Sequence, residues 1–294
     1  MLSKALDFTT TTSLSIMKKT SYFLLSFIFC LQTAAAAQNL QRVTAGHLSA
    51  EEQVLAKFVK NEHRDTLALL FMPGDDYDSV KLAELRASFE DFSHMLKERF
   101  GDSPANFKTL RKISRRVYRQ LLLSYKPLAA FPEVMDNGSY DCLTGTLVFA
   151  WVLEQFGYDY QVRETNYHIF LTVNTPDREV LIESTERFYG FVSSASEITE
   201  RMEEYAADNR KYDDDSKYTA YNFDLNRAIS FQDLLGLMYY NEAVKYFNTQ
   251  QFTLADRELA KSFVFYSTER NQMLYALNQQ MLKRYSPQSA SAAK

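Results

Sequence analysis

The sequence predicts an α+β protein, in which a buried helix and a small antiparallel sheet form the core. Helices are expected on both sides of this core, with a helical hairpin region at the C-terminus. Three observations predict this class. Most of the chain has helical periodicity, three short β-rich runs follow one another in its middle, and only 8 Gly and 6 Pro occur among 294 residues. The 22 Phe and 19 Tyr indicate an aromatic core.

Composition narrows the classes of function. Hydrophobic residues make up 46% of the chain and charged residues 24%, which is typical of a globular protein and not of a disordered or collagen-like one. The formal net charge is −4, so the sequence gives no reason to expect a nucleic-acid partner.

The first 37 residues are typical of a secretory signal peptide. Two lysines follow Met17, residues 22–31 are apolar, and residues 34–37 are four alanines suited to cleavage. The apolar run is about half the length that spans a bilayer. We therefore expect translation to start at Met17, cleavage after Ala37, and an exported protein, periplasmic or extracellular, with no membrane span after cleavage.

An N-terminal helical region is expected over residues 38–126. Ser49 and Glu52 form a capping-box pattern for a helix reaching about residue 60, and a second helix should run from Ser79 to Gly101. Ser103 and Pro104 predict the start of a third. That helix carries six basic residues: Lys108, Arg111, Lys112, Arg115, Arg116 and Arg119. They could bind an anionic surface or form the solvated face of an amphipathic helix, and the acidic excess elsewhere favours the second interpretation.

The core region is expected over residues 127–210. Prolines and an Asp-Asn-Gly turn predict a loop, which precedes an apolar and therefore buried helix. Three β-rich runs and another helix follow it. The expected helices cover residues 141–156 and 196–207, and the expected strands cover 158–164, 168–173 and 179–183.

The C-terminal third is expected to be helical after a linker at 211–229, which begins with an exposed loop at 211–217. The helical region covers residues 230–285, and residues 286–294 form a disordered tail. Its helices are expected at 231–248, 254–266 and 270–285. Residues 235–243, with Phe252 and Ala255, resemble one tetratricopeptide unit. Such a hairpin could bind a peptide or simply pack on the preceding domain, and we favour the second.

Cys142 is the one thiol of the mature chain, because Cys30 lies in the signal peptide. A lone cysteine in an exported protein cannot form an intramolecular disulfide, so it is either inert and buried or a reactive thiol. Cys142 falls in the first turn of the apolar helix. The unpaired N–H groups and positive dipole end there favour a thiolate.

His168 and Glu183 lie on two β-runs joined by a turn at Thr175 and Pro176. A hairpin centred there places His168 directly opposite Glu183, with Cβ atoms roughly 4.5–5.5 Å apart. The same register places Ile169, Leu171, Val180 and Ile182 on the core face. Glu183 would then fix the tautomer of His168, which would accept the proton of Cys142. The alternative is that all three are structural residues, as buried Cys and lone His often are.

The motifs that carry these residues resemble a known family. Cys-Leu-Thr-Gly-Thr at 142–146, Tyr-His-Ile-Phe-Leu-Thr-Val at 167–173 and Leu-Ile-Glu-Ser-Thr at 181–185 are similar to the core of the transglutaminase-like superfamily. The resemblance covers residues 135–190. It implies a papain-like core with Cys142 as nucleophile, His168 as base and Glu183 in place of the usual Asp.

We therefore expect an exported cysteine enzyme that catalyses acyl transfer or hydrolyses amide or peptide bonds, with a protein or peptide substrate. The competing expectation is an inactive member of the superfamily that binds a protein partner through its C-terminal helices. The Cys142 N–H and the Asn137 side chain are candidate oxyanion donors. No metal or other cofactor is expected, because the four His show no ligand spacing.

Overall fold

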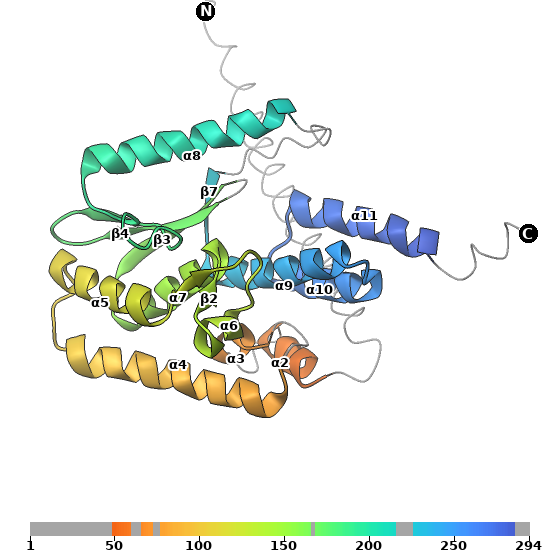
Figure 1. The fold of residues 1–294 in the computed structure, drawn as a ribbon, viewed down its shortest axis with the longest axis horizontal. Helices are drawn as coiled ribbons and strands as arrows, with labels where there is room; N and C mark the ends of the chain where they lie inside the picture. The colour runs from red at the N-terminus through yellow and green to blue at the C-terminus, as the bar shows by residue number, and fades with distance from the viewer. Residues whose placement is uncertain (1–48, 60–65, 73–76, 166–167, 216–225, 286–294) are drawn as a thin grey trace, which may run out of the picture.

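A computed structural model describes residues 49–59, 66–72, 77–165, 168–215 and 226–285. The signal peptide expected at 1–37 and the tail expected at 286–294 lie outside the described residues. The described part is an α+β structure, as the sequence predicts: a five-stranded antiparallel sheet with helices on both faces (Figure 1).

The N-terminal helices are α2 (Ala50–Val59), α3 (Thr66–Leu70), α4 (Ser79–Phe100) and α5 (Phe107–Gln120). The capping box before α2 is confirmed, because Ser49 N–H donates to Glu52 Oε2 at 2.7 Å and Glu52 N–H donates to Ser49 Oγ at 3.2 Å. The predicted start of the third helix at Ser103 is wrong. Asn106 is its cap, since its side-chain oxygen accepts from Thr109 N–H at 3.0 Å.

Helix α5 is amphipathic, and its basic residues form the solvent-exposed face that the sequence favours. Its apolar residues Leu110, Ile113 and Val117 are buried in the main core. Of its six basic residues, Arg116 is half-buried and the other five are exposed to solvent.

The region expected as a loop before the buried helix contains short elements. Strands β1 (Ser124–Tyr125) and β2 (Ser139–Tyr140) pair in parallel, and α6 (Phe131–Asp136) lies between them in the chain. Helix α7 (Cys142–Gln155) follows and is buried as predicted. Asp141 caps it by accepting Thr144 N–H at 2.8 Å, and Thr144 Oγ1 accepts Asp141 N–H at 2.9 Å. This reciprocal cap fixes where α7 begins.

The sheet has the strand order β6-β5-β4-β3-β7. Its strands are β3 (Asp159–Thr165), β4 (Ile169–Asn174), β5 (Glu179–Ile182), β6 (Phe191–Val192) and β7 (Asn226–Ile229). Strand β7 lies in the segment expected as a linker. Helix α8 (Ala195–Asp215) extends beyond its predicted end at 207, so the loop expected at 211–217 is helical as far as Asp215.

The predicted register between the two central strands is wrong by two residues. Leu171 pairs with Ile182, because the turn closed by Thr175 N–H and Arg178 O at 3.0 Å is centred one residue later than expected. His168 is therefore not directly opposite Glu183. A shift of two residues keeps every side chain on its predicted face, since the strand period is two. The predicted core-face set is accordingly in the main core: Ile169, Leu171, Val180 and Ile182.

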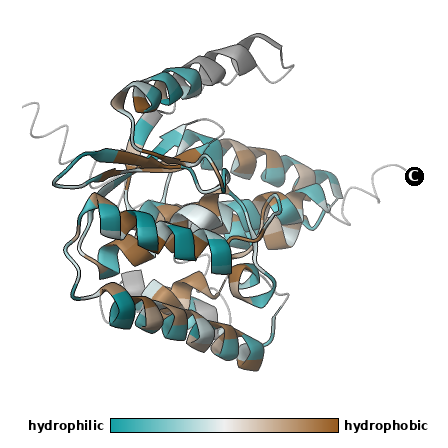
Figure 2. Ribbon diagram, turned by 60° about the vertical axis from the view of Figure 1, so that its left-hand side comes forward, coloured by the Kyte–Doolittle hydropathy of each residue, from teal (hydrophilic) through white to brown (hydrophobic). Residues whose placement is uncertain are grey.

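Both faces of the sheet are covered. Helices α7 and α5 lie below it in Figure 1, and the main core fills the space between them and the sheet. Helix α8 lies above the other face, over a smaller cluster of buried residues: Phe170, Leu181, Val192 and Ile198. Figure 2 shows hydrophobic residues along the strands between these helical layers.

The C-terminal helices are α9 (Phe231–Asn248), α10 (Phe252–Phe265) and α11 (Glu269–Tyr285). Helices α9 and α10 form the predicted hairpin and pack closely, since Ser262 Oγ donates to Gly236 O at 2.6 Å. In the described part of the chain, no helix combines the length and the apolar character needed to cross a membrane.

A buried carboxylate attaches this helical region to the sheet. Glu164 on β3 is 0% exposed. It accepts hydrogen bonds from Arg227 Nε at 3.2 Å, from Arg270 Nη2 at 2.6 Å and from the Tyr266 hydroxyl. A buried charge is tolerated only when it is paired and hydrogen-bonded, so these three donors must stay in place around Glu164.

We predict that Glu164→Ala lowers the free energy of unfolding by about 1–3 kcal/mol, because it leaves the buried Tyr266 hydroxyl without its acceptor. Urea unfolding of the variant and of Glu203→Ala, an exposed residue of α8, measures the difference. Equal stability of the two variants would show that the Glu164 cluster contributes nothing.

Candidate active site

Cys142 is the first residue of α7, directly after its cap Asp141. Its backbone N–H has no hydrogen-bond acceptor among the described residues, as expected for the first turn of a helix. One of the two expected oxyanion donors is therefore available beside the thiol. The other is not: the side-chain oxygen of Asn137 accepts Ser139 N–H at 2.9 Å, and no described hydrogen bond joins Asn137 to Cys142.

His168 and Glu183 lie in direct contact. His168 comes one residue before β4 and Glu183 one residue after β5. Although the two residues are diagonal and not directly opposite, they share the face of the sheet that α8 covers, and the imidazole Nε2 contacts Glu183 Oε2. With Nε2–H donating to the carboxylate, Nδ1 of the neutral ring carries no proton and is an acceptor.

Glu183 is 1% exposed and is held by several donors besides His168. Its Oε1 accepts Thr185 N–H at 3.0 Å and Thr185 Oγ1–H at 2.7 Å, while the Tyr205 hydroxyl donates to Oε2 at 3.3 Å. Burial would raise the pKa of Glu183, but the hydrogen bond and charge of His168 and the bonds from Thr185 hold this pKa below its usual value. Glu183 is therefore a carboxylate that can orient an imidazole.

The residues that follow His168 and Glu183 contact Cys142. Ser184 Oγ donates to the Cys142 carbonyl at 3.3 Å. Gly145 allows this approach, because a Cβ at that position would lie 2.7 Å from both Ser184 Cβ and Oγ. The backbone N–H of Ile169 is hydrogen-bonded to the thiol, which lowers its pKa. The start of α7 is thus packed against the chain on both sides of the imidazole–carboxylate pair.

The electrostatic setting of the thiol differs from the prediction. Cys142 is half-buried as a residue, but burial of its thiol, together with the carboxylates of Asp141 and Glu183, raises its pKa to about 12. The N–H groups of Leu143 and Ile169 oppose this effect without overcoming it. The expectation of a depressed thiol pKa is therefore wrong for this state of the protein. The neighbours of the sulfur are nevertheless polar groups and not only hydrocarbon.

The structure brings two of the three predicted site residues into contact and the third beside them. No hydrogen bond joins the Cys142 sulfur to the His168 ring in the described part of the chain, and Nδ1 of the ring makes none there either. Catalytic hydrogen bonds are often longer in a free enzyme and tighten with substrate.

Three residues that support the site were not predicted from the sequence: Tyr205, Ser184 and Thr185. Tyr205 packs its ring on His168 with centroids 5.1 Å apart, but it comes from α8, so only the tertiary fold places it there. Ser184 and Thr185 directly follow Glu183 in the quoted motif, and that adjacency was a usable signal.

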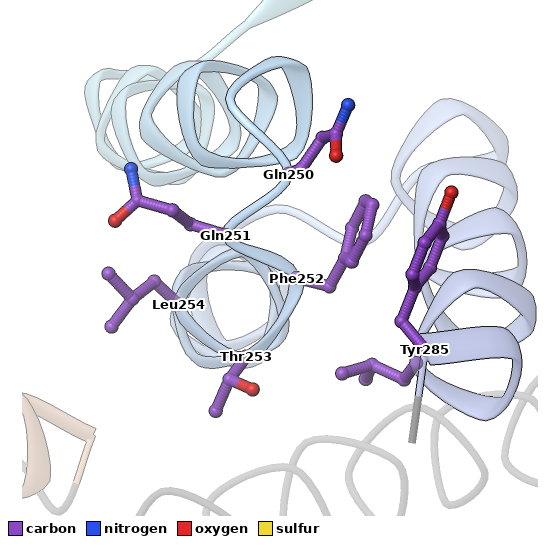
Figure 3. Close-up of a pocket in the computed structure, with 7 residues that line it drawn as sticks. Gln250, Gln251, Phe252, Thr253, Leu254 and Tyr285 are labelled. Atoms are coloured by element: carbon purple, nitrogen blue, oxygen red, sulfur yellow. The ribbon is translucent and has the colours of Figure 1, made fainter. Parts of the chain in front are cut away.

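A separate cavity of about 660 Å³ lies in the C-terminal helices, away from Cys142. Figure 3 shows Phe252 at the start of α10 and Tyr285 at the end of α11 facing one another, and their rings stack with centroids 5.6 Å apart. No group of three or more His, Cys, Asp or Glu side chains within the described ranges is placed to bind a metal ion.

Comparison with family models, with curated proteins and with solved structures found no match for this chain.

We predict that Gly145→Ala lowers the free energy of unfolding by about 1–3 kcal/mol, because the added methyl group overlaps Ser184 and pushes α7 away from it. Urea unfolding measures this. The matched rescue is Gly145→Ala with Ser184→Gly, which restores the space and should recover part of the loss. An unaffected single variant would contradict the close packing.

We also predict that iodoacetamide alkylates Cys142 slowly at pH 7 and that the rate rises up to pH 10 without a plateau, because the thiol pKa is raised to about 12. Asp141→Asn removes a negative charge and keeps a capping oxygen, so it should lower the apparent pKa. An apparent pKa below that of a free thiol, about 8.5, in the unmodified protein would contradict the described environment.

Proposed function

We propose that this protein is a transglutaminase-like cysteine enzyme that transfers acyl groups or hydrolyses amide or peptide bonds, using Cys142, His168 and Glu183. The observation that carries the proposal is the contact between His168 Nε2 and the buried carboxylate of Glu183. This contact leaves Nδ1 as a base, next to a segment whose Ile169 N–H reaches the only thiol among the described residues.

In the proposed reaction, Cys142 Sγ attacks the substrate carbonyl carbon while its proton passes to His168 Nδ1. The Cys142 N–H donates to the oxyanion that forms. The imidazolium then protonates the leaving amine as the C–N bond breaks, which leaves a thioester on Cys142. Water, or an acceptor amine, attacks the thioester after losing a proton to His168, and the thiol is restored. Glu183 stabilises the imidazolium in both halves.

The raised thiol pKa favours one of two versions of this chemistry. Because Cys142 is protonated near neutral pH, a resting thiolate–imidazolium pair is not supported. His168 acts instead as a general base, taking the proton during the attack. The attacking group is then a thiol that stays inert until a carbonyl is held beside it.

A second candidate function is an inactive protein that keeps this core and binds a partner through its C-terminal helices. Burial of the thiol favours it, as does the cavity between α10 and α11 (Figure 3). We place it second because a binding module has no need for a buried carboxylate in contact with an imidazole. A tetratricopeptide-like role for α9 and α10 belongs to this second candidate.

Export to the periplasm or the medium, a peptide or protein substrate, and cleavage of a signal peptide remain predictions. They fit an amidase or peptidase that acts where hydrolysis by water competes with transfer to an amine.

We predict that the protein forms a thioester at Cys142 when mixed with the ethyl thioester of N-acetylphenylalanine, and that it releases ethanethiol with turnover. Mass spectrometry after an acid quench detects the acyl group on the peptide that contains Cys142. Cys142→Ala should abolish acylation. His168→Gln should lower kcat by about 10²–10⁴-fold, because it removes the base.

Glu183→Gln should lower kcat at least tenfold, because it removes the charge that stabilises the imidazolium. The matched control is His94→Gln, an exposed histidine of α4, which should leave kcat unchanged. Wild-type protein that forms no thioester, or turnover that survives in Cys142→Ala, would overturn the enzymatic proposal in favour of the binding module.

A further inference from the structure

Three large exposed side chains lie at the margin of the candidate active site. Tyr125 is 56% exposed, Phe188 is 85% exposed and Tyr189 is 77% exposed. We call these three residues the aromatic rim. Exposed apolar groups that gather in one place are typical of binding surfaces, whereas single ones need no explanation. The contacts of these residues with the candidate active site show whether they belong to one binding surface.

Tyr125 lies near the start of α7. Its ring packs edge-on against Tyr140, with centroids 6.3 Å apart, and Tyr140 comes two residues before Cys142. Burial raises the pKa of Tyr125, and electrostatic interactions with Cys142, Asp141 and Glu183 raise it further. Tyr125 therefore borders the same polar environment as the thiol while most of its ring area remains in solvent.

Phe188 and Tyr189 are carried by a turn that begins at Glu183. Glu183 N–H donates to Gly190 O at 2.7 Å, and Gly190 N–H donates to Glu186 O at 2.6 Å. Only glycine fits position 190, because a Cβ would lie 2.1 Å from Glu183 O. From α8, Arg201 Nη2 donates to Tyr189 O at 3.3 Å. The turn is thus held in place and still exposes both aromatic side chains.

Tyr140 and the turn that begins at Glu183 lie side by side, because a Cβ at Gly145 would lie 3.2 Å from Tyr140 Cδ2 and 2.7 Å from Ser184 Cβ. In that turn the Arg187 guanidinium lies 6.0 Å from the Phe188 ring centroid, and its charge lowers the pKa of Tyr140 against the larger effect of burial. The margin therefore runs from Tyr125 through Tyr140 and Arg187 to Phe188. Apart from Arg187, these residues are aromatic.

We propose that the aromatic rim binds an aromatic or large aliphatic side chain of the acyl donor, and so selects substrates with such a residue beside the attacked carbonyl. The proposal rests on the function proposed for Cys142. Aromatic side chains bury large apolar areas against each other with preferred stacked or edge-on geometry, at a low cost in conformational entropy. A side chain seated between Tyr125 and Phe188 would also remove water from the thiol before attack.

The test compares ethyl thioesters of N-acetylphenylalanine and N-acetylalanine, which differ only in the side chain. Wild-type protein should prefer the phenylalanine thioester in kcat/KM by about 10–100-fold, the range that apolar pockets provide. Tyr125→Ala and Phe188→Ala should each reduce this preference at least threefold, mainly by raising KM for the phenylalanine thioester. Val80→Ala, 68% exposed on α4, is the control and should keep the full preference.

A binding measurement separates failure of this inference from failure of the proposed chemistry. N-acetylphenylalaninamide should bind Cys142→Ala protein, followed by NMR shifts, and should bind at least threefold more weakly when Phe188→Ala is added. If binding depends on Phe188 but no thioester forms, the binding role of the aromatic rim is supported and the proposed enzymatic function is overturned. The binding role of the rim is overturned if a thioester forms without preference between the two donors, or if neither rim variant changes the preference. Either result leaves the proposed enzymatic function intact.

Discussion

The buried carboxylate of Glu183 is the constraint on which the rest of the candidate site depends. A charge that is 1% exposed has to be surrounded by donors, and here they come from His168, Thr185 and Tyr205. These donors lie just before β4, in the turn after β5 and on α8, so one carboxylate fixes three segments relative to one another. The next residue, Ser184, then contacts the start of α7. The orientation of the imidazole and the position of the thiol are therefore coupled.

Two opposing effects act on the pKa of the Cys142 thiol, and their balance determines whether the resting sulfur is a thiol or a thiolate. The start of a helix favours a thiolate through unpaired N–H groups, and Leu143 and Ile169 supply that effect here. Burial acts in the opposite direction and dominates, with the charges of Asp141 and Glu183 adding to it. The cap that fixes the start of α7 is thus also a reason why its first residue stays protonated. Because the thiol stays protonated, this balance favours general-base catalysis by His168 over a resting pair of Cys142 thiolate and His168 imidazolium.

Local rules were enough to predict the elements that carry the site. Alternation along the strands placed His168 and Glu183 on one face, and the apolar run after Asp141 predicted α7. The register was missed because the turn is centred one residue later, and no propensity distinguishes those two positions around Pro176. The contributions of Tyr205 and Gly145 could not be predicted, since both depend on which segments meet in three dimensions. The same holds for the thiol pKa, which burial decides.

The central claim is that Glu183 holds His168 with a proton on Nε2 and leaves Nδ1 unprotonated. Two-bond ¹⁵N–¹H correlation spectra of the folded protein with ¹⁵N-labelled histidine, recorded at alkaline pH, report this tautomer directly. We predict an Nε2–H tautomer for His168, whose population falls toward an unbiased mixture in Glu183→Gln. A neutral ring that carries its proton on Nδ1, or a tautomer indifferent to Glu183, would contradict it.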